Sequence, residues 1–215
     1  MVEILFGGLG WRRRKTVELE AETPKRPTLV VVADSSNVRV RPGREDKIVV
    51  RGVASSRGTA RIVVYQSEGG EVEGRVELYS ADVVVEAPAK AVGVVCDSSS
   101  ISINFEEESV EFVSVKSDSC GINVRALLEE GGGHYAWLDS SGLNSYLKPS
   151  GEGGYWVEVE ADSSGAKIEF EGKKRYIIEE EKLVYSRLSI SDPDVEASVE
   201  VRAKVIADSS SIRLL

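Results

Sequence analysis

The stretch "CDSSSISINF", residues 96–105, joins a polar Asp-Ser-Ser corner to a strict alternation of apolar and polar residues. Alternation with a period of two residues is typical of a strand with one buried face. Asp and Ser side chains can hydrogen-bond to nearby backbone groups, which favours a bend before that strand. The same combination recurs as "ADSSNVRV" (33–40), "SDSCGINV" (117–124), "LDSSGLNS" (138–145), "ADSSGAKI" (161–168) and "ADSSSIRL" (207–214).

The corners are spaced at multiples of one unit length. Successive Asp residues are 63, 21, 21, 23 and 46 residues apart, so degenerate copies are expected near residues 55, 76 and 185. Such a period indicates a repeat architecture in which each unit buries its apolar face against its neighbours. We expect the corners to form a structural ladder of Asp34, Ser35, Asp97, Ser98, Asp118, Ser119, Asp139, Ser140, Asp162, Ser163, Asp208 and Ser209.

These patterns predict an all-β fold over residues 28–215, with residues 1–27 as an N-terminal capping or docking segment. The predicted fold is a single-stranded, right-handed parallel β-solenoid (β-helix) of about eight or nine coils. Each coil would hold 21–23 residues. An antiparallel β-sandwich is the main alternative, because short strands with frequent turns fit it as well. A propeller would need a period of about 40–45 residues.

Composition limits the classes of function. The chain has 215 residues, of which 41% are hydrophobic and 29% charged, as is typical of a globular protein. Its net charge of −9 argues against nucleic-acid binding. The charge is uneven: +6 in residues 1–61, −13 in residues 62–161 and −2 in residues 162–215. Such asymmetry would favour contacts between copies of the chain.

The beginning of the chain, "MVEILFGGLGWRRRKTVELE", has its apolar run before its basic cluster, the reverse of a secretory signal. No stretch approaches about 18 consecutive apolar residues, so no transmembrane helix is expected. A cytoplasmic location is therefore expected, and an extracellular one stays open. A composition rich in Val, Glu and Arg, with one Gln, favours a thermophilic source.

The repeated "DSSxIxI" units with Val-rich strands between them resemble the "putative adhesin" β-solenoid domains, which are similar to the head GIN solenoids. The resemblance covers residues 28–215. It implies a right-handed parallel β-solenoid and an adhesin-like role in a family of mostly unknown function. It supplies no catalytic residue, because the Asp-Ser-Ser corner is a structural signature.

No catalytic, metal or cofactor site is predicted. Stacked Asp carboxylates could bind Ca²⁺, but the Gly-Gly-x-Gly-x-Asp loops of calcium rolls are absent, and whether the ladder binds an ion stays open. His134, the one histidine, occupies a position where other repeats have apolar residues, so we expect a strand-face side chain. Cys96 and Cys120 are expected to be buried thiols without a disulfide.

These observations predict a non-enzymatic interaction module that self-associates through the solenoid ends as a homo-oligomer. Candidate partner contacts are Leu5, Phe6, Trp11, Arg12, Arg13 and Arg14, an apolar-basic segment that could also meet an anionic membrane. The alternative is an adhesive solenoid that binds a glycan or surface polymer. It predicts an exposed aromatic row formed by Tyr135, Trp137, Tyr146, Tyr155 and Trp156.

Overall fold

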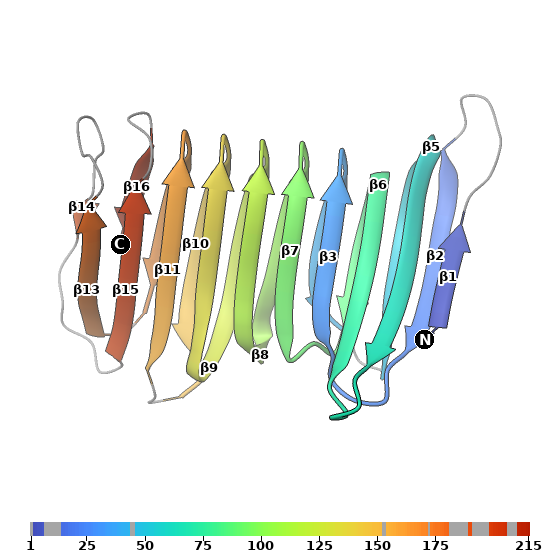
Figure 1. The fold of residues 1–215 in the computed structure, drawn as a ribbon, viewed down its shortest axis with the longest axis horizontal. Helices are drawn as coiled ribbons and strands as arrows, with labels where there is room; N and C mark the ends of the chain where they lie inside the picture. The colour runs from blue at the N-terminus through green and yellow to red at the C-terminus, as the bar shows by residue number, and fades with distance from the viewer. Residues whose placement is uncertain are drawn as a thin grey trace. The chain divides into compact units, whose positions relative to one another are not determined.

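The structure is a computed structural model that describes residues 2–6, 14–43, 46–151, 154–171, 173–180, 189–190, 198–205 and 210–215. In these residues it contains sixteen strands and no helix (Figure 1), so the prediction of an all-β chain is confirmed. The chain divides into two compact units, residues 1–104 and residues 105–215, and each unit is described by itself.

The first unit combines antiparallel and parallel strand pairs. Its strands are β1 (Val2–Phe6), β2 (Lys15–Glu22), β3 (Thr28–Asp34), β4 (Asn37–Pro42), β5 (Lys47–Gln66), β6 (Val72–Ala87), β7 (Ala91–Asp97) and the start of β8 (Ser100–Asp118). Strand β5 runs antiparallel to β1, β2 and β6. Strands β3 and β4 pair in parallel with β6 on one side, and with β7 and β8 on the other.

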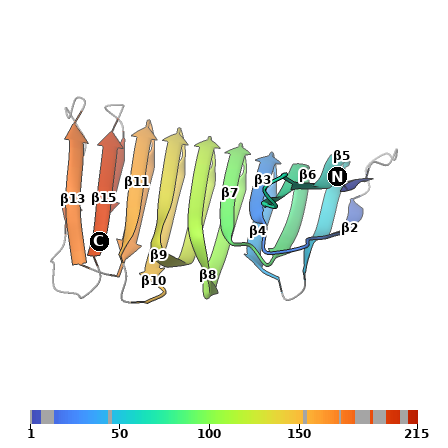
Figure 2. The same ribbon diagram turned by 60° about the horizontal axis from the view of Figure 1, so that its bottom comes forward.

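Strand β3 lies between β6 and β7, although it precedes both in the chain (Figures 1 and 2). Val31 of β3 is opposite Val76 of β6 and Val94 of β7. After Asp34 the chain therefore leaves this position, forms β5 and returns as β6 on one side of β3. It then crosses to the other side as β7, which ends at Asp97 directly beside Asp34.

In the second unit, every strand pair with a described register is parallel. Its strands, after the remainder of β8, are β9 (Gly121–Asp139), β10 (Gly142–Pro149), β11 (Tyr155–Asp162), β12 (Gly165–Phe170), β13 (Lys173–Glu180), β14 (Ser189–Ile190), β15 (Ser198–Val205) and β16 (Ser211–Leu214). Here too chain order and spatial order differ. Strand β15 pairs with both β11 and β13, so it separates two strands that precede it (Figure 2).

The predicted right-handed β-solenoid of eight or nine successive coils is wrong. The gap of 63 residues between Asp34 and Asp97 contains antiparallel strands instead of three coils, and the two corners are direct neighbours. The gap of 46 residues after Asp162 does not contain two coils in chain order, because β12 pairs directly with β16. The corners are regularly spaced in the sequence, but the solenoid prediction assumed that segments stack in the order in which they occur in the chain.

Alternating side chains separate a core from an outer face. In β11, Val157, Val159 and Ala161 are 0% exposed, whereas Trp156 and Glu158 are half-buried. Burying a Val side chain contributes about 1.5–3 kcal/mol, so the register of each strand is held by its apolar set. The side chains between them are thereby fixed on the outer face, where a ligand can reach them.

Candidate functional site

The Asp-Ser-Ser corners share one backbone geometry. The Ser that follows each Asp has a positive φ of 47–56°, which is uncommon for a residue other than glycine. Its hydroxyl donates a hydrogen bond to Oδ1 of the preceding Asp, at 2.7–3.2 Å. These bonds hold the Asp side chain at its own corner. The Ser residues that follow a corner Asp and have this φ are Ser35, Ser98, Ser119, Ser140 and Ser163.

The next residue of each corner is buried and connects neighbouring copies. Ser141 Oγ donates to the carbonyl of Asp139 at 2.7 Å and accepts the backbone N–H of Cys120 at 3.0 Å. Cys120 replaces the usual Ser, and its Sγ donates to the carbonyl of Asp118 at 3.2 Å. Ser36, Ser99 and Ser164 make the same two bonds as Ser141: the hydroxyl donates to the carbonyl of the corner Asp and accepts a backbone N–H from a neighbouring corner. The hydroxyls of this row are therefore used internally and have no evident role in ligand binding.

Within each unit, corner Asp residues occupy equivalent positions on paired strands. Asp34 is opposite Asp97, and Asp139 is opposite Asp162. Among the described residues there is no group of three or more His, Cys, Asp or Glu side chains placed to hold a metal ion. The predicted ladder members Asp208 and Ser209 lie outside the described residues.

The degenerate copy expected near residue 76 is present as a corner at Tyr79-Ser80-Ala81. Ser80 has a φ of 49°, and Tyr79 is opposite Asp34. The backbone N–H of Ala81 donates to Ser36 Oγ at 3.1 Å, just as the backbone N–H of Cys120 donates to Ser141 Oγ. The sequence signal for this corner is a Ser followed by the alternation "ADVVVEA".

His134 and Ser145 form a buried polar pair in the core of the second unit. His134 is 0% exposed and Ser145 is 4% exposed. His134 Nδ1 lies 3.1 Å from the carbonyl of Val113, which can only accept, so Nδ1 carries the proton. Nε2 then accepts from Ser145 Oγ at 3.1 Å. Burial lowers the pKa of His134 to about 4, although the bond to Val113 acts in the opposite direction. The pair therefore serves the core as a neutral hydrogen-bonded unit.

Aromatic side chains gather on the outer face of the second unit, on β8, β9 and β11. We call Phe112, Tyr135, Trp137 and Trp156 the aromatic face; all four are half-buried. The rings of Phe112 and Trp156 are 5.3 Å apart between centroids, with an interplanar angle of 45°. Trp156 is opposite Gly133 on β9. A Cβ atom on Gly133 would lie 2.2–2.6 Å from three indole atoms, so the indole lies directly against this glycine.

Charged side chains border the aromatic face. Lys116 Nζ lies 5.3 Å from the ring centroid of Trp137, a cation–π contact. Glu158 is opposite Tyr135, and Glu160 is opposite Trp137. The pKa of Tyr135 is raised, first by partial burial and then by the charges of Glu160 and Glu158. The face therefore combines ring surfaces with hydrogen-bonding groups.

The predicted aromatic row is only partly present. Tyr135, Trp137 and Trp156 share the aromatic face, but Tyr155 points inward and is 3% exposed. Its hydroxyl lies 3.0 Å from the carbonyl of Glu171 and burial raises its pKa. Tyr146 lies on β10, where it donates to Glu171 Oε1 at 2.7 Å. Sequence reasoning missed Phe112 and Gly133, whose roles depend on strand register.

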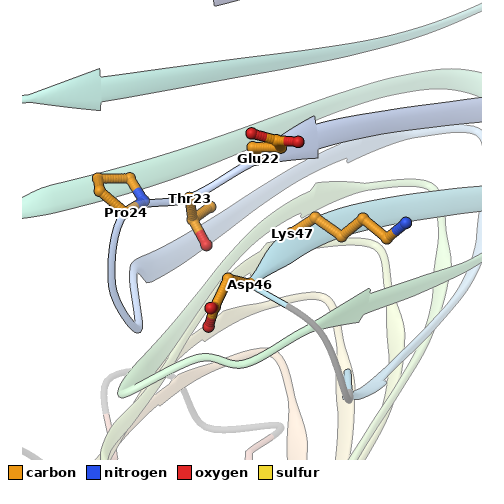
Figure 3. A pocket seen from close by; sticks show the side chains of 5 residues that line it. All are labelled: Glu22, Thr23, Pro24, Asp46 and Lys47. Atoms are coloured by element: carbon orange, nitrogen blue, oxygen red, sulfur yellow. The ribbon is translucent and has the colours of Figure 1, made fainter.

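A pocket in the first unit lies where β2 ends and β5 begins (Figure 3), and it is lined by Glu22, Thr23, Pro24, Asp46 and Lys47. The carboxylates of Glu22 and Asp46 point away from each other, so they do not form an acid pair or a chelating site. Thr23 is 3% exposed, and its hydroxyl has no hydrogen-bond partner in the described part of the chain. The pocket therefore has polar walls without convergent chemistry.

The predicted partner contacts at the N-terminus fall largely outside the described residues. Trp11, Arg12 and Arg13 are not described, and for Leu5 and Phe6 only the backbone is described, as part of β1. Arg14 is exposed. The described part of residues 1–27 contains strands β1 and β2, and a docking role for this segment is not tested.

Comparisons with known proteins identify no family. No protein-family model and no curated protein matches the chain. A solved "putative cell adhesion protein" from Clostridium sporogenes has 8% identity and a TM-score of 0.42, over 94% of this chain and 98% of its own. A "putative adhesin" from Bacteroides fragilis has 12% identity and a TM-score of 0.28, over 94% and 97%.

A "putative lipid binding protein" from Parabacteroides distasonis has 10% identity and a TM-score of 0.29, over 94% of this chain and 96% of its own. Similarity at this level carries no argument about activity or ligand. In the described residues, no helix has the length and apolar character needed to cross a membrane. Of these three solved structures, two are named for adhesion and one for lipid binding.

Proposed function

We propose that this chain is a non-enzymatic, adhesin-like interaction module that binds a carbohydrate through the aromatic face of its second unit. One observation carries the proposal: aromatic side chains from β8, β9 and β11 meet on one outward face and are bordered by charged groups. Aromatic rings provide apolar surface with a polar rim, which suits the apolar face and the hydroxyl groups of a sugar ring.

The buried position of the histidine argues against a catalytic Ser–His pair at this site. A Ser–His pair acts as a nucleophile and base only where a substrate can approach it. His134 is 0% exposed and Ser145 is 4% exposed, so the pair is closed to a substrate in this structure. Its hydrogen bonds are also those expected of a core pair, since the ring bonds a backbone carbonyl on one side.

The test is a glycan array probed with the full chain and with the variant Trp156→Leu. Leucine keeps apolar cover over Gly133 but removes the aromatic ring, so we expect binding to at least one glycan that the variant loses. Tyr79→Ala is the matched control, because Tyr79 is an outward aromatic residue of the first unit and is 45% exposed. An array without any signal, or equal signals for wild type and Trp156→Leu, would reject this function.

Self-association is a second candidate, which the strand edges favour. In the described residues, β13 pairs only with β15 and β14 only with β16, so the other side of each has no partner strand. Unpaired strand edges are templates for pairing with another chain. Sedimentation velocity over a hundredfold range of concentration should then show a dimer or larger species. A monomer throughout that range would contradict the candidate.

A further inference from the structure

We infer that the ligand of the aromatic face is a linear, uncharged polysaccharide that lies along β9 and stacks on Trp156. This inference rests on the proposed function and specifies its ligand.

The orientation of Trp156 is set by Gly133. Any side chain at residue 133 would collide with the indole, because even a Cβ atom would approach it to 2.2–2.6 Å. Gly133 is buried although it lies on the outer face of β9, which shows that the indole covers it. Trp156 is itself half-buried, so part of the ring remains open to solvent. A ring held against the backbone in this way offers a preformed stacking surface and loses little entropy on binding.

The aromatic face is a row with a direction. Trp156 lies at the level of Gly133, and Tyr135 and Trp137 follow on the same side of β9, each two residues further along. Four residues of strand extend about 13 Å. The row can therefore contact several linked sugar rings in succession, which favours an extended polymer over a single sugar.

Charges of both signs lie beside the row. Lys116 lies over Trp137, while Glu158 is opposite Tyr135 and Glu160 is opposite Trp137. Lys116 repels a cationic amino-sugar polymer at a ring on which that polymer would stack. A polyanion meets a second unit whose sequence has 22 Asp and Glu against 12 Lys and Arg, a net charge of −10 over residues 105–215. An uncharged polymer avoids both costs and still accepts and donates hydrogen bonds.

The experiment is calorimetric titration of the full chain with three series of oligosaccharides, each from the monomer to the hexamer. One series is neutral, one is a glucosamine series and one is a uronic-acid series. We expect the neutral series to bind most tightly, with affinity that rises until the oligomer spans about 13 Å and then levels off. Trp156→Leu should lower the affinity for the longest neutral oligomer about tenfold, and Trp156→Phe should lower it less.

The outcomes separate this inference from the proposed function. Tighter binding of either charged series, or an affinity that is independent of length, would overturn the inference and leave carbohydrate binding intact. Failure of all three series together with a silent array would remove both. The variants are compared by circular dichroism and thermal unfolding, and Tyr79→Ala should bind the neutral hexamer as the wild type does.

Discussion

His134 and Ser145 are polar residues at core positions, and each is the hydrogen-bond partner of the other. Most repeats have an apolar residue at both positions, so either polar side chain alone would be buried without a partner. Together they satisfy each other at 3.1 Å, and the carbonyl of Val113 satisfies the other ring nitrogen. The pair is stable only while the imidazole is neutral.

Stability should therefore fall as the pH decreases from about 6.5 to about 4. The pKa of His134 is about 4 in the folded chain and 6.5 in its ordinary state. Between these values the unfolded chain binds a proton that the folded chain does not, which favours unfolding by up to about 3 kcal/mol. Urea unfolding at several pH values measures this loss.

The double variant His134→Val/Ser145→Val is the control for that measurement. It restores the apolar residues of the other repeats, so it should lose about 3 kcal/mol less than the wild type over the same pH range. Carboxylates titrate in both proteins and cancel in the comparison. Equal pH dependence of the two proteins would mean that His134 is not held neutral in the core.

Thr23 is a second residue whose effect on the free energy of unfolding can be measured. Its hydroxyl is buried and has no partner within the described residues. Thr23→Val has nearly the same shape and removes the unsatisfied group, so we expect it to stabilise the chain by about 1 kcal/mol. Thermal unfolding of the two proteins provides the test, and a clear loss of stability would show that the hydroxyl has a partner in solution.

At the scale of the strand, β11 packs Trp156 against Gly133 of β9, where the lack of a side chain leaves room for the indole. Gly133→Ala would place a Cβ atom 2.2–2.6 Å from the Trp156 indole, so the ring must move away from Phe112. We expect a destabilisation of about 1–3 kcal/mol and a changed near-ultraviolet circular dichroism spectrum. Gly142→Ala is the matched control in the same unit, since its Cβ would meet nothing within 4 Å. Identical spectra for both variants would contradict the packing of Trp156 on Gly133.

At the scale of the whole molecule, the order of the strands can be tested by cross-linking. Val32 of β3 is opposite Val95 of β7, and both are accessible from outside. Parallel neighbours are about 4.8 Å apart, so Val32→Cys/Val95→Cys should form a disulfide under mild oxidation. The background carries Cys96→Ala and Cys120→Ser, and mass spectrometry detects the bond.

The control pair is Val32→Cys/Ser55→Cys. Counting by the period would place Ser55 one coil after β3, but it lies on β5, which pairs with β1, β2 and β6. This pair should stay reduced under the same conditions. A disulfide in the Val32→Cys/Ser55→Cys variant, with none in the Val32→Cys/Val95→Cys variant, would show that the strands stack in the order in which they occur in the chain.

The sequence was sufficient to predict strands, corners and buried positions, because these depend on neighbours along the chain. Val31, Val94 and Val159 all carry the alternation that buries them, and Ser98 and Ser140 carry the bend. The neighbours of each strand were not predictable, because pairing depends on contacts distant in sequence that the period does not encode. The aromatic face was found only in part for the same reason: Phe112 joins it through register alone.

The interior position of β3 has a consequence for how the chain is made. A ribosome delivers residues 28–34 well before residues 72–97, yet β3 is enclosed by strands that belong to the later segment. Strand β3 therefore stays unpaired on both of its hydrogen-bonding sides until β6 and β7 have been synthesised. The β5–β6 hairpin, in contrast, can close on its own from local contacts. Nascent chains stalled shortly after residue 66 should accordingly be the species most prone to aggregation during synthesis.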